Sequence, residues 1–270
     1  MSSTSCIEDC PESTPVKPLP YGGLRFALRP SVIEDVWVFL AVLFAREYDS
    51  LNLLPSDNVL DVGANIGVFS VLTSLRCKSI FSVEANPSNF QLLQTNLSLN
   101  AVRNCLSQQV AASDRRGVLH MEGQGGLSRI ARDGVPVKSD TLDSILQNLG
   151  SPRIDVLKMD IEGHEVEALR GFSGLRDVRE AIIEVHSPAL LRKTREILES
   201  LGFHLRDVSR IKGTRVLREL LLHPISFALA DSLTSFHTTR STLSYFLGLG
   251  PSPVAASNEG ADQCVILATK

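Results

Sequence analysis

Two glycines and an acidic residue stand where a parallel α/β sheet places its ligands. An apolar strand that ends near Asp61 runs into Gly63-Ala-Asn-Ile-Gly67, and the next apolar run ends at Glu84. Ligands of open α/β sheets lie beyond the carboxyl ends of the strands, where the first strand-to-helix turn meets them with bare backbone. Gly63 can adopt positive φ, and Gly67 lets the following helix sit close to the strand. These residues predict a pocket for a nucleoside-containing cofactor.

The spacing of the turn separates two classes of cofactor. Glu84 follows the turn by about 20 residues, the separation expected of a carboxylate that accepts hydrogen bonds from ribose hydroxyls. Dinucleotide-binding turns carry G-x-G-x-x-G, whereas this turn lacks the third glycine, and Asp61 would repel a pyrophosphate. Asp61 could instead accept a hydrogen bond from an ammonium group, and Asn65 tolerates a left-handed conformation. The pattern favours S-adenosylmethionine over NAD; an ordinary turn that binds no ligand is the alternative.

A second group of reactive side chains follows two later strands. Asp160 ends one apolar run and Glu162 lies two residues beyond it, while Glu184 and His186 close the next run. A hydroxyl acceptor must lose its proton before or during methyl transfer. We expect Asp160, with His186 or Glu184, to orient and deprotonate the acceptor. Lys158 is expected to balance the negative charge.

The same four groups allow a different interpretation. A divalent cation bound by these carboxylates and the imidazole would lower the pKa of the acceptor directly. The sequence does not show that the groups converge, so we expect no metal. His164 is the alternative to Lys158 for charge balance, and Lys158 could equally be a strand-end residue paired with a neighbouring carboxylate. Glu165 and Glu167 lie in the first turn of a helix, where the helix dipole favours acids.

Composition limits the class of protein. The chain has 270 residues, of which 43% are apolar, and its 27 basic and 30 acidic residues give a net charge of −3. A sizeable core is expected, and no basic excess indicates nucleic acid as a partner. The five cysteines form no C-x-x-C pair, and no signal peptide is visible. The longest apolar run, Val36 to Ala45, is too short to span a bilayer and is expected to be a core helix. The odd number of cysteines argues against a disulfide framework, so we expect a reducing, cytoplasmic location.

The chain is expected to divide into a proline-rich disordered tail (1–22), an α/β core (23–210), a helical insertion (211–260) and a last strand of the core (261–270). Between Asn58 and Asp207, apolar strands alternate with helical patterns, which is typical of a parallel sheet with crossover helices. The predicted helices are Glu34–Tyr48, Pro87–Leu99, Ala189–Leu201, Val216–Ala230 and Thr238–Phe246. The predicted strands of the sheet are Asn58–Val62, Ser79–Glu84, Ser107–Ala112, Ile154–Asp160, Ala181–His186, one starting at Phe203, and Gln263–Thr269. An added hairpin is predicted from Val118–Met121 and Val135–Lys138.

The insertion is expected to form a cap or an interaction arm. It combines basic residues, among them Arg215 and Arg218, with leucines such as Leu217 and Leu221. Such a helix is solvated, forms the seam of a homodimer, or seeks a membrane surface. A homodimer through the insertion is the partner that we expect beside a small-molecule acceptor.

Several segments together carry a resemblance to a known family. They are Glu47-Tyr48, VLDVGANIGVFS from Val59, VEANPSNFQLLQTN from Val83, AASDRRG from Ala111, TLD from Thr141, IDVLKMDIEGHEVEALRGF from Ile154 and IIEVH from Ile182. On these motifs the chain resembles the FkbM-type S-adenosylmethionine-dependent methyltransferases. The resemblance implies a Rossmann-like sheet of seven strands with the last antiparallel, and methyl transfer to an oxygen of a small molecule or sugar.

The resemblance also implies positions for the cofactor. By position, the methionine part would be surrounded by Asp61, Gly63, Ala64, Asn65 and Gly67; Glu84 would hold the ribose; and the adenine would lie near Ala85, Asn86, Ser113 and Asp114. Two rival functions stay open, namely an RNA or protein methyltransferase and a cofactor-binding module without turnover. The balanced charge disfavours the first, and the carboxylates at the strand ends disfavour the second.

Overall fold

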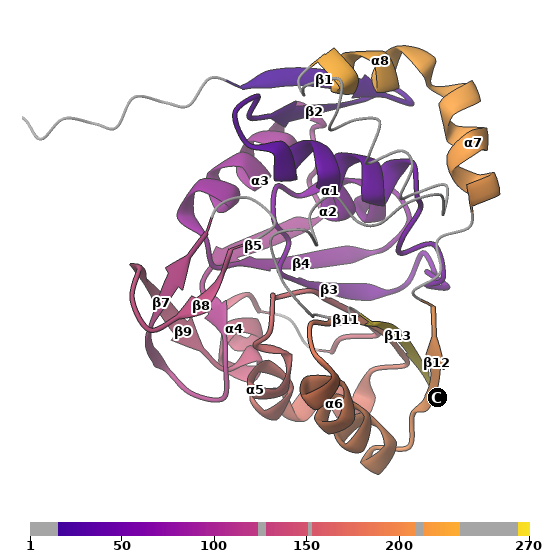
Figure 1. The fold of residues 1–270 in the computed structure, drawn as a ribbon. Coiled ribbons are helices and arrows are strands. Elements are labelled where there is room, and N and C mark those ends of the chain that lie inside the picture. Colours follow the sequence, from indigo (N-terminus) through magenta and orange to yellow (C-terminus); the bar gives the residue numbers. More distant parts are fainter. Residues whose placement is uncertain (1–15, 124–127, 151–152, 209–212, 233–263) are drawn as a thin grey trace, which may run out of the picture.

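Seven strands of the described chain form one central sheet in the order β12-β13-β11-β10-β3-β4-β5. The computed structural model describes residues 16–123, 128–150, 153–208, 213–232 and 264–270. Neighbouring strands pair in parallel except β13, which runs antiparallel to β11 and β12. The mostly parallel α/β architecture is confirmed (Figure 1). The strands are β3 (Asn58–Val62), β4 (Ser79–Glu84), β5 (Cys105–Gln109), β10 (Val156–Met159), β11 (Glu180–Val185), β12 (His204–Asp207) and β13 (Cys264–Thr269).

Helices cover both faces of this sheet (Figure 1). One face carries α1 (Ile33–Leu43), α2 (Val68–Ser74) and α3 (Pro87–Leu99), and the other carries α4 (Leu142–Asn148), α5 (Glu165–Arg170) and α6 (Pro188–Ser200). Successive strand residues point to opposite faces, so β3 contributes to both layers of the core. Val59 packs in the layer of Phe39 and Leu93, whereas Leu60 packs in the layer of Leu142. Because helices cover both faces of the sheet, a ligand site is expected at the carboxyl ends of its strands.

Helix α1 is shorter than predicted. It ends at Leu43 instead of continuing to Tyr48, and Arg46 has a φ of 57°, which no α-helix accommodates. The turn brings Tyr48 against Phe69, with their ring centroids 5.2 Å apart. The segment that follows α1 is therefore a connection that delivers an aromatic ring to the sheet.

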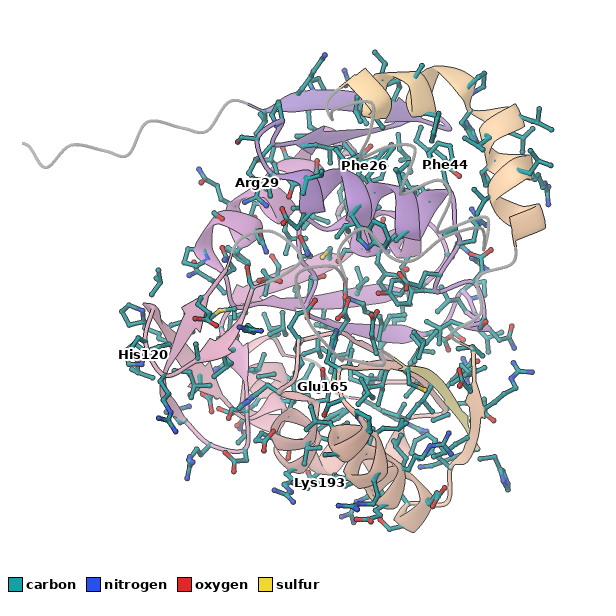
Figure 2. The ribbon with its side chains drawn as sticks, in the orientation of Figure 1. Phe26, Arg29, Phe44, His120, Glu165 and Lys193 are labelled. Atoms are coloured by element: carbon teal, nitrogen blue, oxygen red, sulfur yellow. The ribbon has the colours of Figure 1, made fainter. Side chains whose placement is uncertain are left out.

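The predicted disordered tail is wrong for its last residues. Strand β1 (Lys17–Tyr21) pairs antiparallel with β2 (Leu24–Leu28). Leu19 and Phe26 are fully buried, and Figure 2 shows Phe26 between this hairpin and the helices below it. Pro18 and Pro20 alternate with the buried residues and are exposed on a short strand that tolerates the missing N–H groups. Residues 1–15 of the predicted tail lie outside the described residues.

A second sheet stands beside the carboxyl ends of the central strands. It has the order β6-β9-β7-β8, with bounds β6 (Ala111–Ala112), β7 (Gly117–Glu122), β8 (Arg129–Ala131) and β9 (Val135–Asp140). The predicted hairpin corresponds to β7 and β9, which pair antiparallel. The single strand predicted at Ser107–Ala112 is divided, because β6 leaves the central sheet and pairs with β9. This sheet forms one wall of the pocket described below.

The described part of the insertion docks on the N-terminal hairpin. The helix predicted at Val216–Ala230 is split into α7 (Gly213–Leu222) and α8 (Pro224–Ser232), because Pro224 cannot continue a helix. Tyr21 donates a hydrogen bond to Glu219 at 2.7 Å, and the Phe227 ring lies 5.9 Å from that of Phe44. The helix predicted at Thr238–Phe246 lies outside the described residues. None of the described helices is long and apolar enough to cross a bilayer.

Candidate functional site

The turn after β3 is built as its glycines predict. Gly63 has a φ of 75°, and a Cβ there would lie 1.7 Å from the carbonyl oxygen of Asp160. Gly67 has a φ of 84°, and its Cβ would lie 2.5 Å from a methyl group of Leu93 in α3. Asn65 takes the left-handed conformation, with a φ of 50°. Any side chain at Gly63 would therefore separate the turn from β10.

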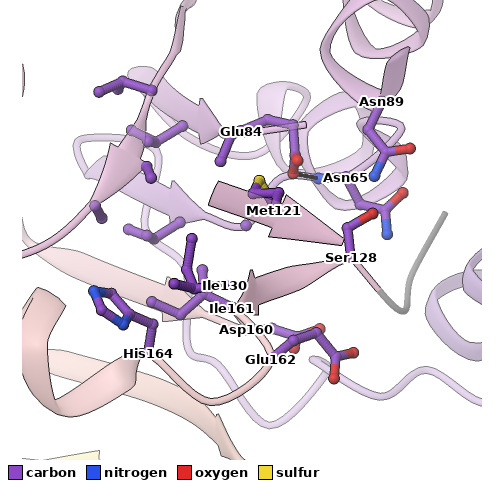
Figure 3. Close-up of a pocket in the computed structure, with 17 residues that line it drawn as sticks. Asn65, Glu84, Asn89, Met121, Ser128, Ile130, Asp160, Ile161, Glu162 and His164 are labelled. Atoms are coloured by element: carbon purple, nitrogen blue, oxygen red, sulfur yellow. Dashed lines mark hydrogen bonds between the residues drawn. The ribbon is translucent and has the colours of Figure 1, made fainter. Parts of the chain in front are cut away.

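Glu84 lies across the turn at the end of β4, with 6% of its surface exposed. One carboxylate oxygen accepts the N–H of Asn65 at 2.8 Å (Figure 3). The other accepts the N–H of Asn86, also at 2.8 Å. Burial raises the pKa of Glu84 to about 6, although the two backbone hydrogen bonds oppose this shift. The carboxylate is thus held in one orientation and is mostly ionised at neutral pH.

A pocket opens beyond the carboxyl ends of β3, β4 and β10 (Figure 3). Its apolar side chains come from the central strands and from the second sheet, where Met121 and Ile130 face it. Its polar side chains include Asn65, Glu84 and Asp160. The lining residues are Val62, Gly63, Asn65, Val83, Glu84, Ala85, Asn89, Val110, Ala111, Ala112, Met121, Ser128, Ile130, Asp160, Ile161, Glu162 and His164.

Five of the predicted site residues line this pocket, namely Gly63, Asn65, Glu84, Ala85 and Asp160. The other predicted cofactor residues, which are Asp61, Ala64, Gly67, Asn86, Ser113 and Asp114, do not line it. Asn86 caps α3 instead, because its side chain accepts the N–H groups of Ser88 and Asn89. Ser113 is nearly buried and shares a 3.0 Å hydrogen bond with His164, which does line the pocket. Asn86 and Ser113 thus support the walls of the pocket rather than form them.

Asp61 lies beneath the turn and is fully buried. It accepts a hydrogen bond from Ser70 at 2.6 Å and forms a 3.2 Å ion pair with the Nζ atom of Lys158. The same ammonium donates to the carbonyl of Gly63 at 2.7 Å. Burial alone would lower the pKa of Lys158, but Asp61 and Asp160 reverse the shift and raise it. The ammonium expected to meet Asp61 is therefore provided by the protein itself, and Lys158 braces the turn.

The strand-end residues converge as a cluster. His186 at the end of β11 places its Nε2 atom 3.3 Å from Glu162, 3.6 Å from Asp160 and 3.8 Å from Glu184. Its Nδ1 atom lies 2.8 Å from a carboxylate oxygen of Glu165, which is fully buried. Asp160, Glu162, Glu184 and His186 are thus brought together, and Glu165 is the partner that orients the imidazole.

The cluster carries an excess of acid. Burial and the charge of Asp160 raise the pKa of Glu184 well above its usual range. Burial also raises the pKa of Glu47 to about 7, with Asp160 adding to the effect. Burial would lower the pKa of His186, but Glu165 and the surrounding carboxylates raise it to about 10. Glu47 belongs to this cluster although only a family motif, and no spacing rule, singles it out.

Several pocket residues were not predicted. Asn89 lies one helical turn from the cap Asn86, and its side-chain oxygen accepts a 2.7 Å hydrogen bond from Arg29. The helical spacing from Asn86 is a signal that could have identified it. Met121 and Ile130 have no such signal, because only the folding of the second sheet turns them toward the pocket.

Comparisons with known proteins bear on this arrangement. A family model described as the methyltransferase FkbM domain matches residues 61–205. The hexuronic acid methyltransferase AglP of Haloferax volcanii is 29% identical over 166 residues, which cover 57% of this chain and 68% of that protein. The methyltransferase sdnD of Sordaria araneosa is 27% identical over 223 residues, which cover 67% of this chain and 85% of that protein. The solved methyltransferase FkbM of Methylobacillus flagellatus KT is 20% identical, with a TM-score of 0.46, and the match covers 62% of this chain and 43% of that one.

The matched segment begins at Asp61 and ends within β12, so it takes in the glycine turn, Glu84 and the strand-end cluster. It accounts for more than half of the chain. The resemblance drawn from the sequence motifs is thereby confirmed. The pocket, its bracing residues and every member of the cluster except Glu47 lie inside this segment, and the chain is a methyltransferase that belongs to the FkbM-domain family.

Proposed function

We propose that the chain transfers a methyl group from S-adenosylmethionine to a hydroxyl oxygen of a small molecule or sugar. The observation that carries the proposal is the position of Glu84, a nearly buried carboxylate that lines the pocket opposite the bare backbone of Gly63. A carboxylate one strand away from such a turn is suited to accept hydrogen bonds from ribose hydroxyls.

The remaining walls fit a nucleoside. Each oxygen of Glu84 accepts one backbone N–H in the structure, and each keeps a lone pair for a further donor. Met121, Ile130 and Ile161 offer an apolar surface for a purine ring. S-adenosylmethionine bound there would supply an electrophilic methyl group. Asp61 and Lys158 would act from below by fixing the turn.

The acceptor would lie on the side of Asp160, which belongs both to the pocket lining and to the strand-end cluster. Its Oδ2 atom is 3.4 Å from the hydroxyl of Tyr48, while its Oδ1 atom has no hydrogen-bond partner among the described residues. A carboxylate that keeps an oxygen without a hydrogen bond at this place is suited to accept a hydrogen bond from an acceptor hydroxyl and to take its proton. Glu184 and His186 would hold Asp160 in place.

The class of acceptor is inferred from the relatives. AglP is named a hexuronic acid methyltransferase, which supports a sugar hydroxyl as the acceptor. A net charge of −3 offers no general attraction for RNA, whose phosphates bind basic surfaces.

The test combines binding with turnover. Calorimetry with S-adenosylmethionine should show one binding site, and a labelled methyl donor should transfer label to members of a panel of uronic acids and neutral sugars. Asp160→Asn should bind the cofactor as the unchanged protein does and lose about 10²–10⁴-fold in turnover, the usual contribution of a general base. Absence of cofactor binding would refute the proposal, and undiminished turnover in Asp160→Asn would exclude Asp160 as the base.

A further inference from the structure

One imidazole nitrogen at the site is buried and lacks a hydrogen-bond partner. The side chain of His186 is 9% exposed, and its Nε2 atom makes no hydrogen bond among the described residues. It points at three carboxylates, with the nearest oxygen at 3.3 Å. A buried polar atom without a partner costs free energy, so this nitrogen calls for a ligand.

The carboxylates offer a matching set of oxygen atoms. One ligand atom each from Asp160, Glu162 and His186 lies within 4.8 Å of the other two. Nitrogen and oxygen ligands bind a transition metal at about 2.1 Å, which places two of them about 3.0 Å apart at a right angle and about 3.4 Å apart at a tetrahedral angle. The distances of 3.3 Å and 3.6 Å from His186 to Glu162 and Asp160 are close to these values.

A buried carboxylate orients the imidazole from behind. Glu165 is fully buried and does not line the pocket. One of its carboxylate oxygens lies 2.8 Å from the Nδ1 atom of His186. The same oxygen accepts the N–H of Gly163 at 2.9 Å, which fixes its position. The surrounding carboxylates favour the protonated imidazole, so a cation would bind by displacing the proton from Nε2. The carboxylate on Nδ1 would then direct the freed lone pair of Nε2 toward the metal.

We propose that Asp160, Glu162 and His186 bind one divalent transition-metal cation at the edge of the cofactor pocket, with Glu184 beside it. An imidazole among carboxylates favours manganese, iron or zinc over calcium. The cation would bind Oδ1 of Asp160, which has no hydrogen-bond partner among the described residues. With the cation bound, Oδ2, which lies 3.4 Å from the Tyr48 hydroxyl, would be the oxygen that takes the proton of the acceptor. The sequence does not reveal that these groups converge, and their convergence in the structure is the reason for proposing a metal where the sequence predicts none.

The position of the cation beside the pocket indicates a catalytic role. Asp160 and Glu162 both line the pocket, so open coordination positions would face a bound acceptor. A cation there would lower the pKa of an acceptor hydroxyl and hold it for attack on the methyl group. This catalytic role rests on the proposed function, whereas cation binding does not.

Manganese alone is the probe for binding. Titration of the full chain with Mn²⁺, followed by the loss of the electron paramagnetic resonance signal of the free ion, should show one site. Glu162→Gln and His186→Ala should each weaken Mn²⁺ binding at least about tenfold, and Glu165→Gln about 10–100-fold, as expected for an orienting carboxylate. Glu167→Gln, the same change in the same helix at a residue that faces His164, is the control and should bind as the unchanged protein does.

The readouts separate this proposal from the proposed function. Nitrogen hyperfine coupling to bound Mn²⁺ should appear in the unchanged protein and vanish in His186→Ala; if that variant does not fold, loss of affinity in the more exposed Glu162→Gln decides. No Mn²⁺ binding, or equal binding in Glu162→Gln and Glu167→Gln, overturns the site. Cofactor calorimetry in EDTA tests the proposed function separately. Methyl transfer that is undiminished after EDTA treatment overturns the catalytic role of the cation.

Discussion

Replacing Glu84 by glutamine should separate cofactor binding from folding. The change keeps the size of a side chain that is 6% exposed and replaces one acceptor oxygen by an NH₂ group. Both oxygens accept backbone N–H groups at 2.8 Å, so the amide can satisfy only one of Asn65 and Asn86. The two effects of this change on the free energy of unfolding oppose each other.

The effect of Glu84→Gln on the free energy of unfolding follows from the pKa of Glu84. Burial raises the pKa of Glu84 from 4.5 to about 6, so the ionised carboxylate destabilises the fold by about 2 kcal/mol at neutral pH. Because the folded protein holds the proton more tightly, this penalty is absent below pH 4.5 and is complete above pH 6. Glutamine removes it but leaves one N–H without an acceptor, which costs about 1–3 kcal/mol. We expect the free energy of unfolding at pH 7 to change by less than about 1.5 kcal/mol.

Cofactor binding should change more. A hydrogen bond to a charged group contributes about 1.5–3 kcal/mol, and the variant loses one such bond to a ribose hydroxyl and weakens the other. The expected loss is about 2–4 kcal/mol, or roughly 30- to 1000-fold in the Kd of S-adenosylmethionine measured by calorimetry. In the unchanged protein, affinity should also fall as pH drops below about 6, where Glu84 is protonated. This pH dependence should be absent in Glu84→Gln.

A matched control and a modified ligand sharpen the test. Glu122→Gln changes the same residue type at an exposed position of β7 that pairs with Arg129, and it should leave the Kd unchanged. A cofactor analogue without ribose hydroxyls should bind the unchanged protein weakly and should not distinguish it from Glu84→Gln. An unchanged Kd in a folded Glu84→Gln variant would refute the ribose assignment.

Two further substitutions test the parts of the fold that hold the site. Gly63→Ala should lower the free energy of unfolding by more than about 3 kcal/mol in urea titrations, because its Cβ would meet the carbonyl oxygen of Asp160 at 1.7 Å and φ is positive. A stability within 1 kcal/mol of the unchanged protein would contradict this close approach. Leu19→Ala should cost about 2–5 kcal/mol, as truncation of a fully buried leucine does, whereas the same change at exposed Leu75 should cost little. If Leu19→Ala proves neutral, the N-terminal hairpin does not belong to the folded core.

The sequence alone predicted the elements that depend on local pattern. Strand β3, its glycine turn and Glu84 were found because apolar periodicity and positive φ are properties of a few neighbouring residues. Parallel strands share one carboxyl edge, so Asp160 and His186 were expected at the same edge before their distances were known. The short alternation that buries Leu19 lies within a proline-rich stretch, so composition alone predicts a tail where the structure has a strand.

Only the tertiary structure decided which partners these residues take. Lys158 lies 95 positions from Gly63 along the chain and still donates to its carbonyl, which no local pattern encodes. The choice of Glu165 as the partner of His186, and the wall that Met121 contributes, likewise depend on how separate strands and helices pack. Residue types and spacing determined what chemistry the edge of the sheet could carry. The packing of distant segments decided which groups are free to perform it, because burial and orientation are set by contacts that span the whole chain.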